Sequence, residues 1–219
     1  MAEELWNAVD DYIGERLVGE DAALHEVAKA SEMAGLPAIA VAPNQGKLLH
    51  LYAKMIGAKR VLEIGTLGGY STIWLARALP ADGLVVTLEY SPEHAEVAEA
   101  NIAHAGVADR VQVRVGAALD LLPDLAGEAP FDLVFIDADK QNNANYFQWA
   151  LRLTKPGSVI VVDNAVRGGA IADPSRDSSD VVGTRQLYDV VSAETRVTAT
   201  AVQTVGAKGH DGFLIARVN

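Results

Sequence analysis

Cysteine is absent from this chain of 219 residues, and long apolar runs are absent too. Without cysteine there are no disulfide bonds, no thiolate metal sites and no cysteine nucleophile. The apolar run from Leu133 to Ile136 is one of the longest, and it ends far short of the roughly 20 residues that a membrane span needs. The first residues, Met1 to Glu4, are acidic and lack the basic start and apolar stretch of a secretory signal. We therefore expect a cytoplasmic protein with no membrane partner.

Basic residues are scarce relative to acidic ones. The chain has 18 Lys and Arg against 29 Asp and Glu, which gives a formal net charge of −11 at pH 7. An acidic surface repels phosphate backbones, and no cluster of basic residues interleaved with aromatics offsets it. We therefore expect no nucleic-acid partner. Solubility alone is a sufficient reason for the acidity.

The order of apolar segments predicts one α/β domain. Half of the residues are apolar, which is enough for a full core at this length. Residues 1–57 are expected to form an N-terminal helical cap. Residues 58–219 are expected to form a core in which β-branched runs alternate with amphipathic helical stretches. Such alternation, with strands apolar on both faces, indicates a parallel sheet covered by helices on both sides.

The boundaries of the expected elements follow from apolar periodicity and from turn residues. Helices of the cap are expected near Glu3 to Val18, Ala22 to Ala34 and Pro43 to Ile56. Strands are expected at Arg60 to Ile64, Leu84 to Leu88, Val111 to Val115, Phe131 to Ile136, Val159 to Val162, Arg196 to Val202 and Gly212 to Val218. Core helices are expected at Ser71 to Ala78, Pro92 to Ala105, Ala144 to Leu153 and Val182 to Val191. A turn is expected at Lys155-Pro156-Gly157, and a mobile loop at Asp173 to Asp180.

A glycine-containing loop follows the first expected strand. Glycines at this point allow a ligand to approach the backbone at the turn into a helix. The spacing differs from the G-x-G-x-x-G of NAD-binding proteins, because Thr66 and Leu67 follow Gly65. The carboxylate of Glu63 would repel a pyrophosphate but attract an ammonium or a sulfonium group. Glu89, at the end of the second strand, is suited to accept hydrogen bonds from ribose hydroxyls. Two acids at successive strand ends favour S-adenosylmethionine over NAD.

Oxygen-bearing side chains also end the fourth and fifth expected strands. Asp137 follows one strand, and Asp163 and Asn164 follow the other. Acids after a strand often only cap the following helix. If the two strands are neighbours, however, two carboxylates and an amide converge, and such hard oxygen ligands favour Mg²⁺ or a similar ion, such as Mn²⁺ or Ca²⁺. We therefore predict a metal site beside the cofactor loop.

Lys140 lies three residues beyond Asp137. Lysine is usually a solvated surface residue. Near a divalent ion, however, like charge would favour the neutral amine, which can accept a proton. Lys140 is therefore a candidate general base.

Together these motifs resemble the cation-dependent O-methyltransferases, the family that contains the catechol and caffeoyl-CoA O-methyltransferases. The resemblance runs from about Val41 to the C-terminus and includes Asp211-Gly212 before the last strand. It implies a Rossmann-like class I methyltransferase fold, with a seven-stranded, mostly parallel sheet flanked by helices and extra N-terminal helices. It implies metal ligation by Asp137, Asp163 and Asn164, with catalytic roles for Lys140 and Asp137. The implied cofactor contacts are Val41, Glu63, Gly65, Thr66, Ser71, Glu89, Ala118 and Asp137.

The chain departs from the family pattern beside the expected acceptor pocket. After Asp163-Asn164 the family often has an aliphatic residue followed by Trp, whereas here Val166 is followed by Arg167 and two glycines. Arg167 is either a contact for an acidic acceptor or an exposed loop residue. The acceptor therefore stays open between a free catechol, a CoA thioester, a flavonoid and an antibiotic precursor.

The predicted activity is transfer of a methyl group from S-adenosylmethionine to one hydroxyl of a catechol-like small molecule, with a divalent ion as Lewis acid and template. Relatives of this kind imply a homodimer. Two alternatives remain at this stage. One is an NAD-linked oxidoreductase on a similar sheet, and the other is a non-catalytic module that binds S-adenosylmethionine.

Overall fold

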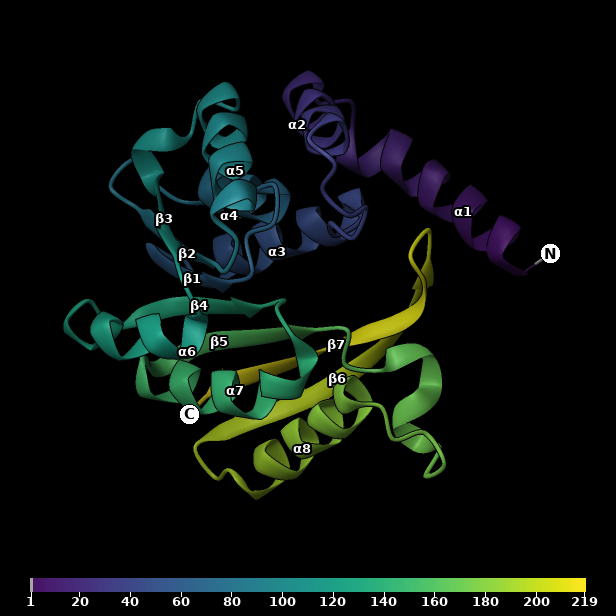
Figure 1. The fold of residues 1–219 in the computed structure, drawn as a ribbon, viewed down its shortest axis with the longest axis vertical. Helices are drawn as coiled ribbons and strands as arrows, with labels where there is room; N and C mark the ends of the chain where they lie inside the picture. The colour runs from purple at the N-terminus through teal and green to yellow at the C-terminus, as the bar shows by residue number, and fades with distance from the viewer. Residues whose placement is uncertain (1) are drawn as a thin grey trace.

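The computed structural model of the chain describes residues 2–219. The first residue of the expected cap, Met1, lies outside the described residues. The cap contains α1 (Ala2–Ile13), the π-helical turn η1 (Gly14–Val18), α2 (Ala22–Met33) and α3 (Pro43–Met55). Asp21 caps α2 by accepting a hydrogen bond from the Leu24 backbone N–H at 3.1 Å. In Figure 1, α1 projects from the body, whereas α3 lies against the core. The three expected cap helices are confirmed.

The core contains one seven-stranded sheet with the order β3-β2-β1-β4-β5-β7-β6. The first five strands pair in parallel, and β7 is antiparallel to both β5 and β6. The strands are β1 (Arg60–Ile64), β2 (Leu84–Glu89), β3 (Val111–Val115), β4 (Phe131–Ile136), β5 (Thr154–Asp163), β6 (Val197–Gly206) and β7 (Gly209–Val218). The expected mostly parallel, seven-stranded sheet is therefore confirmed.

Helices cover both faces of this sheet (Figure 1). On one face α3 is joined by α4 (Tyr70–Ala78) and α5 (Pro92–His104). On the other lie α6 (Ala118–Leu121), α7 (Asn143–Arg152) and α8 (Ser179–Ala193). Short 3₁₀ segments complete the chain: η2 (Ala108–Arg110), η3 (Leu122–Gly127), η4 (Lys140–Asn142) and η5 (Arg167–Ala172). Within residues 2–219, no helix is both long enough and apolar enough to cross a membrane.

Two apolar cores lie on opposite sides of the sheet because neighbouring residues of a strand point to opposite faces. In β1, Val61 packs in the core that includes Ile73 of α4. Its neighbour Leu62 packs in the other core with Phe147 of α7 and Leu187 of α8. These five side chains are all excluded from solvent, with an exposed fraction of 0%. Burial on both faces is the reason that most residues of the central strands are apolar.

Several predicted boundaries differ from those of the structure. The expected turn at 155–157 belongs to β5, where the register against β4 shifts between Phe131 and Leu133 and Gly157 has a φ of +93°. The chain there forms an irregular strand start rather than a separate turn. The last two strands are longer than predicted and form a hairpin whose tip pairs Gly206 with Gly209. The hairpin's exposed, largely polar residues carry little of the apolar signal that the prediction used. Helix α8 begins at Ser179 rather than at Val182.

Candidate active site

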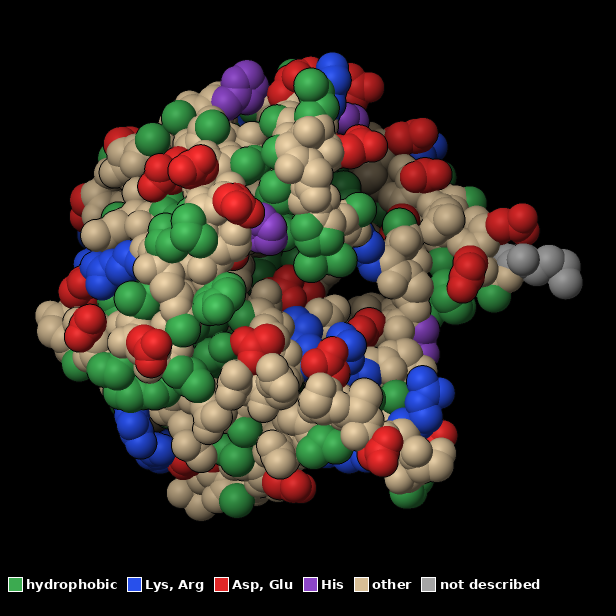
Figure 2. All heavy atoms as spheres, in the orientation of Figure 1, with side chains coloured by type: hydrophobic (Ala, Val, Ile, Leu, Met, Phe, Trp, Pro, Cys, Tyr) green, Lys and Arg blue, Asp and Glu red, His purple; other side chains and the backbone are tan. Residues whose placement is uncertain are grey.

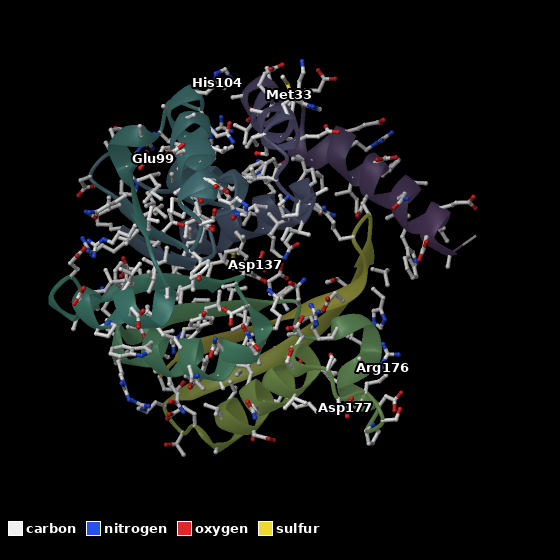
Figure 3. All side chains as sticks on the ribbon, in the orientation of Figure 1. Met33, Glu99, His104, Asp137, Arg176 and Asp177 are labelled. Atoms are coloured by element: carbon white, nitrogen blue, oxygen red, sulfur yellow. The ribbon has the colours of Figure 1, made fainter. Side chains whose placement is uncertain are left out.

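The carboxyl ends of β1 and β4 meet where the order of strands reverses, and this is the place where open α/β sheets bind ligands. Gly65 follows β1, and Asp137 follows β4. The Asp137 N–H donates a hydrogen bond to the Ile64 carbonyl oxygen at 2.8 Å. A Cβ atom at Gly65 would lie 2.2 Å from the Asp137 carbonyl oxygen, and the φ of Gly65 is +101°. Only glycine is compatible with this approach. Figure 3 places Asp137 near the middle of the molecule, and Figure 2 shows a hollow in the same region.

Glu63 lies beneath this loop and not on its surface. Its side chain is fully buried and accepts hydrogen bonds from Ser71 Oγ at 2.6 Å, from Thr87 Oγ1 at 2.7 Å and from Thr72 Oγ1. Burial is the main cause that raises the pKa of Glu63 to about 7, while the three hydroxyls oppose this shift. Glu63 therefore organises the start of α4. Its expected contact with the cofactor remains a prediction, as does that of Ser71.

Glu89, on the neighbouring strand, holds the loop of residues 65–69 that follows β1, which is called the cofactor loop here because the methyl donor is expected beside it. Its Oε2 atom accepts hydrogen bonds from the backbone N–H groups of Thr66 at 3.2 Å and Leu67 at 2.8 Å. Its Oε1 atom accepts one from the Ser91 N–H at 3.0 Å. Leu67 has a φ of +50°, a conformation that is uncommon outside glycine. The carboxylate of Glu89 therefore holds the loop in shape at the edge where the ligand is expected.

The other two expected cofactor contacts lie beside this loop. Val41 is buried in the apolar core immediately before α3. Ala118 begins α6, and the preceding turn is attached to β2 because the Gly116 N–H donates to the Glu89 carbonyl oxygen at 2.8 Å. Both residues lie near the carboxyl edge of the sheet. Their direct contact with a cofactor remains a prediction.

The three expected metal ligands lie at the ends of two neighbouring strands. The register pairs Ile136 with Val162, so Asp137 and Asp163 leave β4 and β5 side by side. Neighbouring strands are about 4.8 Å apart, which is close enough for the two side chains to share one ion. Asn164 follows with a φ of +54°, a left-handed conformation in which asparagine is enriched among non-glycine residues. Residues 2–219 contain no cluster of three His, Cys, Asp or Glu side chains that could hold a metal. The candidate set differs from such a cluster because its third donor is an amide oxygen.

The electrostatics of this set fit a divalent cation. Burial, and then the charge of Asp137, raise the pKa of Asp163 to about 7. One ammonium faces the two carboxylates: Lys140 Nζ lies 2.6 Å from Asp137 Oδ1, and its charge lowers the pKa of Asp163. Two carboxylates and an amide, with one monovalent counter-charge, are a donor set of the kind that Mg²⁺ prefers.

Lys140 is buried, with an exposed fraction of 8%. It begins η4, which packs against α8 so closely that a Cβ atom at Gly183 would lie 2.5 Å from the Lys140 carbonyl oxygen. Lys140 therefore does not occupy the solvated surface position that is usual for lysine, the alternative to a role in the site. Lys140 Nζ donates a hydrogen bond to Asp137, and its role as general base remains a prediction.

One residue of this site was missed from the sequence. The side chain of Gln45 donates a hydrogen bond to Asp163, which lowers the pKa of that carboxyl. Its neighbour Asn44 donates from Nδ2 to Asp10 Oδ1 at 2.8 Å, and Asp10 Oδ2 accepts from the Ala207 N–H at 2.8 Å. The cap and the hairpin tip are thereby joined close to the end of β5, where the candidate metal ligand Asp163 lies. No local pattern in the sequence indicates that the start of α3 lies against the end of β5.

The loop after Asn164 is held in place by two side chains. Asp211 Oδ1 accepts from the backbone N–H groups of Val166 at 3.0 Å and Arg167 at 2.9 Å. Arg185 of α8 donates to four backbone carbonyl oxygens of the loop, those of Ala170, Ile171, Asp173 and Arg176. The segment that we expected to be mobile is therefore pinned to α8 by a guanidinium group.

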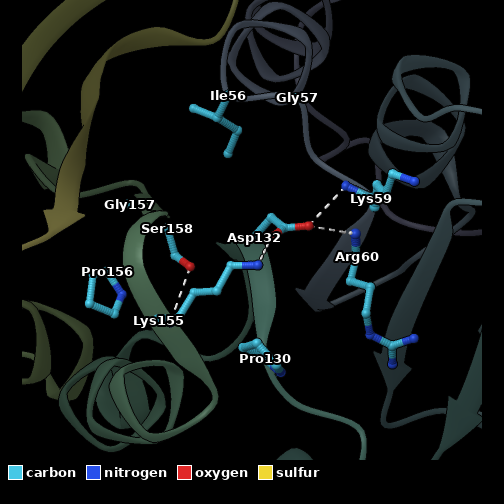
Figure 4. A pocket seen from close by; sticks show the side chains of 10 residues that line it. All are labelled: Ile56, Gly57, Lys59, Arg60, Pro130, Asp132, Lys155, Pro156, Gly157 and Ser158. Carbon is cyan, nitrogen blue, oxygen red and sulfur yellow. Dashed lines mark hydrogen bonds and ion pairs between the residues drawn. The ribbon is translucent and has the colours of Figure 1, made fainter.

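A separate cavity of about 520 Å³ lies at the opposite edge of the sheet, around the starts of β1, β4 and β5 (Figure 4). Asp132 Oδ2 accepts from the backbone N–H groups of Lys59 at 2.9 Å and Arg60 at 3.0 Å, and its Oδ1 pairs with Lys155 Nζ at 2.8 Å. Lys59 Nζ pairs with Asp82 at 2.7 Å. The two acidic and two basic side chains neutralise one another, and their contacts connect the starts of β1, β4 and β5. The cavity contains none of the expected site residues.

The sheet and the acid-lined strand ends at its switch point define a class I S-adenosylmethionine-dependent methyltransferase. The pattern of the family described as O-methyltransferase matches residues 15–217. A catechol O-methyltransferase of Mycobacterium tuberculosis is 58% identical over 96% of this chain and 94% of its own length. One of Niastella koreensis is 49% identical over 100% of both chains. The chain therefore belongs to the O-methyltransferase family.

Solved structures agree with this assignment. The O-methyltransferase from Bacillus cereus, in complex with SAH, is 53% identical with a TM-score of 0.97, over 99% of both chains. The O-methyltransferase TomG from Streptomyces achromogenes, involved in tomaymycin synthesis and solved with SAM, is 52% identical with a TM-score of 0.96, over 100% of this chain and 99% of that one. The chain is an S-adenosylmethionine-dependent O-methyltransferase. An NAD-linked oxidoreductase and a non-catalytic module find no support.

Proposed function

We propose that this O-methyltransferase depends on a divalent cation and methylates one hydroxyl of a catechol-like small molecule. The observation that carries the proposal is the register of β4 and β5, which brings the ends of the two strands together at Asp137 and Asp163. Asn164 supplies a third oxygen from the same edge. Two relatives of this chain are named catechol O-methyltransferases. Adjacent hydroxyls are suited to share one ion, so the name and the donor set support the same acceptor class.

Each residue of the site has a distinct task in this proposal. Asp137, Asp163 and Asn164 would hold a cation such as Mg²⁺, with Mn²⁺ or Ca²⁺ as alternatives. When bound, the cation would supply Lewis acidity toward the acceptor hydroxyls, and its charge would disfavour the neighbouring ammonium. Lys140 would then accept the acceptor's proton at Nζ. Glu89 and Gly65 shape the loop that orients the methyl donor.

The chemical balance of the transfer is simple. One proton leaves the acceptor hydroxyl for Lys140, an oxygen–carbon bond forms, and the sulfur–carbon bond breaks with its electrons remaining on sulfur. No oxidant or reductant is required. The chain contributes orientation and exclusion of water, since Asp163 and Lys140 are both buried.

The direct test is an assay with a panel of vicinal diols: free catechols, a CoA thioester, a flavonoid and an antibiotic precursor. We expect methylation of at least one of them, loss of activity in excess EDTA, and recovery with added Mg²⁺. Binding of S-adenosylhomocysteine, measured by thermal shift, controls for damage to the cofactor site. Full turnover in excess EDTA would contradict the cation dependence, and methylation of isolated hydroxyls alone would contradict the catechol assignment.

The homodimer implied by the family resemblance also stays a prediction. Within α1 no residue is buried, and Leu5, Val9 and Tyr12 present exposed side chains at spacings that place them on one helical face. A second copy of the chain would cover such a face. Light scattering of the wild type and of a Val9→Asp variant would test this, because a dimer through α1 should dissociate in the variant.

The absence of nucleic-acid partners and the cytoplasmic location likewise stay predictions.

A further inference from the structure

Arg167 has a fixed backbone close to the candidate metal ligands. It lies three residues after Asn164, and both residues have a φ of +54°. The carboxylate of Asp211 accepts hydrogen bonds from the N–H groups of Val166 and Arg167. Left-handed residues at 164 and 167 are costly unless the surrounding contacts hold them. The chain therefore maintains a specific turn that begins at Asn164 and presents Arg167.

The guanidinium of Arg167 is only partly used by the protein. Nη2 lies 3.1 Å from Asp180 Oδ2, and 27% of the side chain is exposed. Nε is buried and has no hydrogen-bond partner among the described residues. A guanidinium has five N–H donors in a planar fork. With Nε buried and Nη2 paired with Asp180, the N–H donors left for a further acceptor lie at the exposed end of the group.

The position of Asp180 relates Arg167 to the catalytic end of the molecule. Asp180 lies in the first turn of α8, and Gly183 follows less than one helical turn later. Gly183 abuts the backbone of Lys140 and Gln141, and Lys140 in turn donates to Asp137. Arg167, Asp180 and Lys140 thus belong to one wall, made of η5, α8 and η4. In Figure 2, basic and acidic side chains gather at the hollow in this part of the molecule.

We propose that Arg167 binds a carboxylate of the acceptor, so that the preferred acceptor class is a catechol that bears a carboxylate group. This inference rests on the proposed function and specifies its substrate. A guanidinium forms charge-assisted hydrogen bonds with carboxylates, and the exposed end of Arg167 offers donors for such a bond beside Asp180. A protein with a formal net charge of −11 repels anions overall, so an anionic acceptor needs a local cation that is held in place. Asp180 orients this cation through Nη2.

The test compares 3,4-dihydroxybenzoate with catechol as acceptors at saturating Mg²⁺ and S-adenosylmethionine. We expect the wild type to favour the acid, and Arg167→Met to lower the ratio of the two kcat/KM values by about 10- to 100-fold, as for loss of one charge-assisted hydrogen-bonded pair. The matched control is Arg176→Met, which removes the same charge from the same loop. Figure 3 shows Arg176 at the outer side of the molecule, away from Asp137, so the ratio should not change. A wild type without preference, or equal losses for both acceptors in Arg167→Met, would overturn the proposal.

A binding measurement separates this inference from the proposed function. Calorimetric titration of 3,4-dihydroxybenzoate into the complex with S-adenosylhomocysteine should give a Kd that rises 10- to 100-fold in Arg167→Met, again as for one charged pair. If catechols prove not to be methylated but this dependence on Arg167 holds, the proposed function fails and the carboxylate site stands. If methylation is cation-dependent but neither measurement responds to Arg167, the carboxylate site fails alone. If Arg167→Met and Asp180→Asn each lower kcat/KM equally for both acceptors, Arg167 has only a structural role through its pair with Asp180, and the proposal fails.

Discussion

Lys140 and Asp137 form an ion pair, with Nζ 2.6 Å from Oδ1, at the point where β4 ends. The proposed proton acceptor is therefore bonded to a proposed cation ligand. The two roles are compatible only if cation binding takes up the Asp137 carboxylate and leaves Lys140 able to lose its proton.

Replacing Lys140 separates its charge from its ability to accept a proton. Lys140→Ala should lower kcat with a catechol by about 10²–10⁴-fold, the usual contribution of a general base. Lys140→Arg should be equally slow, because a guanidinium keeps the positive charge but stays protonated. Affinity for S-adenosylhomocysteine is the control and should stay close to that of the wild type. Near-normal turnover in the arginine variant would show that only the charge matters.

Asp163 provides the test of the cation site. Asp163→Asn keeps the shape of the side chain but removes one of the two converging negative charges. The Mg²⁺ concentration needed for half-maximal activity should rise by at least about tenfold. Asp82→Asn, which changes an exposed carboxylate paired with Lys59, is the matched control and should not alter this value. An unchanged Mg²⁺ requirement in Asp163→Asn would argue against ligation by Asp163.

Glu63 should make the stability of the fold depend on pH. Its pKa is about 7 in the folded protein, against an ordinary value of 4.5, so between these values the folded state binds more protons than the unfolded state. Stability contributed by this group is fully present below pH 4.5 and is lost as pH rises through 7. Glu63→Gln removes the titration. The free energy of unfolding of the variant, relative to wild type, should therefore increase from pH 4.5 to 7 and then level off, with a total change of about 3 kcal/mol.

The hydroxyls around Glu63 change the difference in free energy of unfolding between variant and wild type, but they do not change how this difference varies with pH. Ser71, Thr72 and Thr87 all donate to the carboxyl group, so at least one of these hydroxyls must reorient to accept from an amide nitrogen in its place. That mismatch lowers stability by the same amount at each pH. Urea unfolding at several pH values separates the constant offset from the pH-dependent part. A relative stability that decreases with pH would contradict the raised pKa.

Gly65 is the position at which a methyl group should be least tolerated. Gly65→Ala requires a φ of +101° and a Cβ atom 2.2 Å from the Asp137 carbonyl oxygen. The conformation alone costs about 1–3 kcal/mol, and the contact must displace the backbone of Asp137, a proposed cation ligand. We expect loss of binding of S-adenosylhomocysteine together with lower stability. Gly127→Ala, where a Cβ atom meets nothing within 4 Å, is the control and should behave as wild type in both measurements.

Parts of this site could be predicted from the sequence because strand ends obey a simple geometric rule. Parallel strands place their carboxyl ends at one edge, so Asp137, Asp163 and Asn164 could be grouped once β4 and β5 were taken as neighbours. The burial of Glu63 was harder to predict. Alternation within β1 directs this side chain onto the face covered by α4, where hydroxyls of Ser71 and Thr72 meet it.

Contacts made by side chains from distant segments could not be predicted. Gln45 reaches Asp163 from the start of α3, more than one hundred residues earlier in the chain. The loop from 173 to 180 has the Ser, Asp and Pro composition of a mobile segment. Its composition contains no information about Arg185, which donates to its carbonyl groups from α8. Such hydrogen bonds between distant segments depend on tertiary packing rather than on the local sequence pattern.

Arg185 therefore gives a prediction about order in the loop beside Arg167. Its Nε donates to the Ile171 carbonyl oxygen at 3.0 Å, and its Nη1 and Nη2 donate to those of Arg176 and Ala170, each at 2.8 Å. In Arg185→Ala these carbonyls lose a shared donor, so amides from 170 to 178 should exchange with solvent faster, while those in α7 should not.

The same change should affect the acceptor more than the cofactor. If the loop positions Arg167, Arg185→Ala should raise KM for 3,4-dihydroxybenzoate by about tenfold, as for loss of one charge-assisted hydrogen bond. Affinity for S-adenosylhomocysteine should change little, because Glu89 holds the cofactor loop from β2. Arg176→Ala removes a guanidinium from the same segment but keeps the backbone carbonyl that Arg185 contacts, so it should reproduce neither effect. Fast exchange with an unchanged KM would mean that the loop does not form part of the acceptor site.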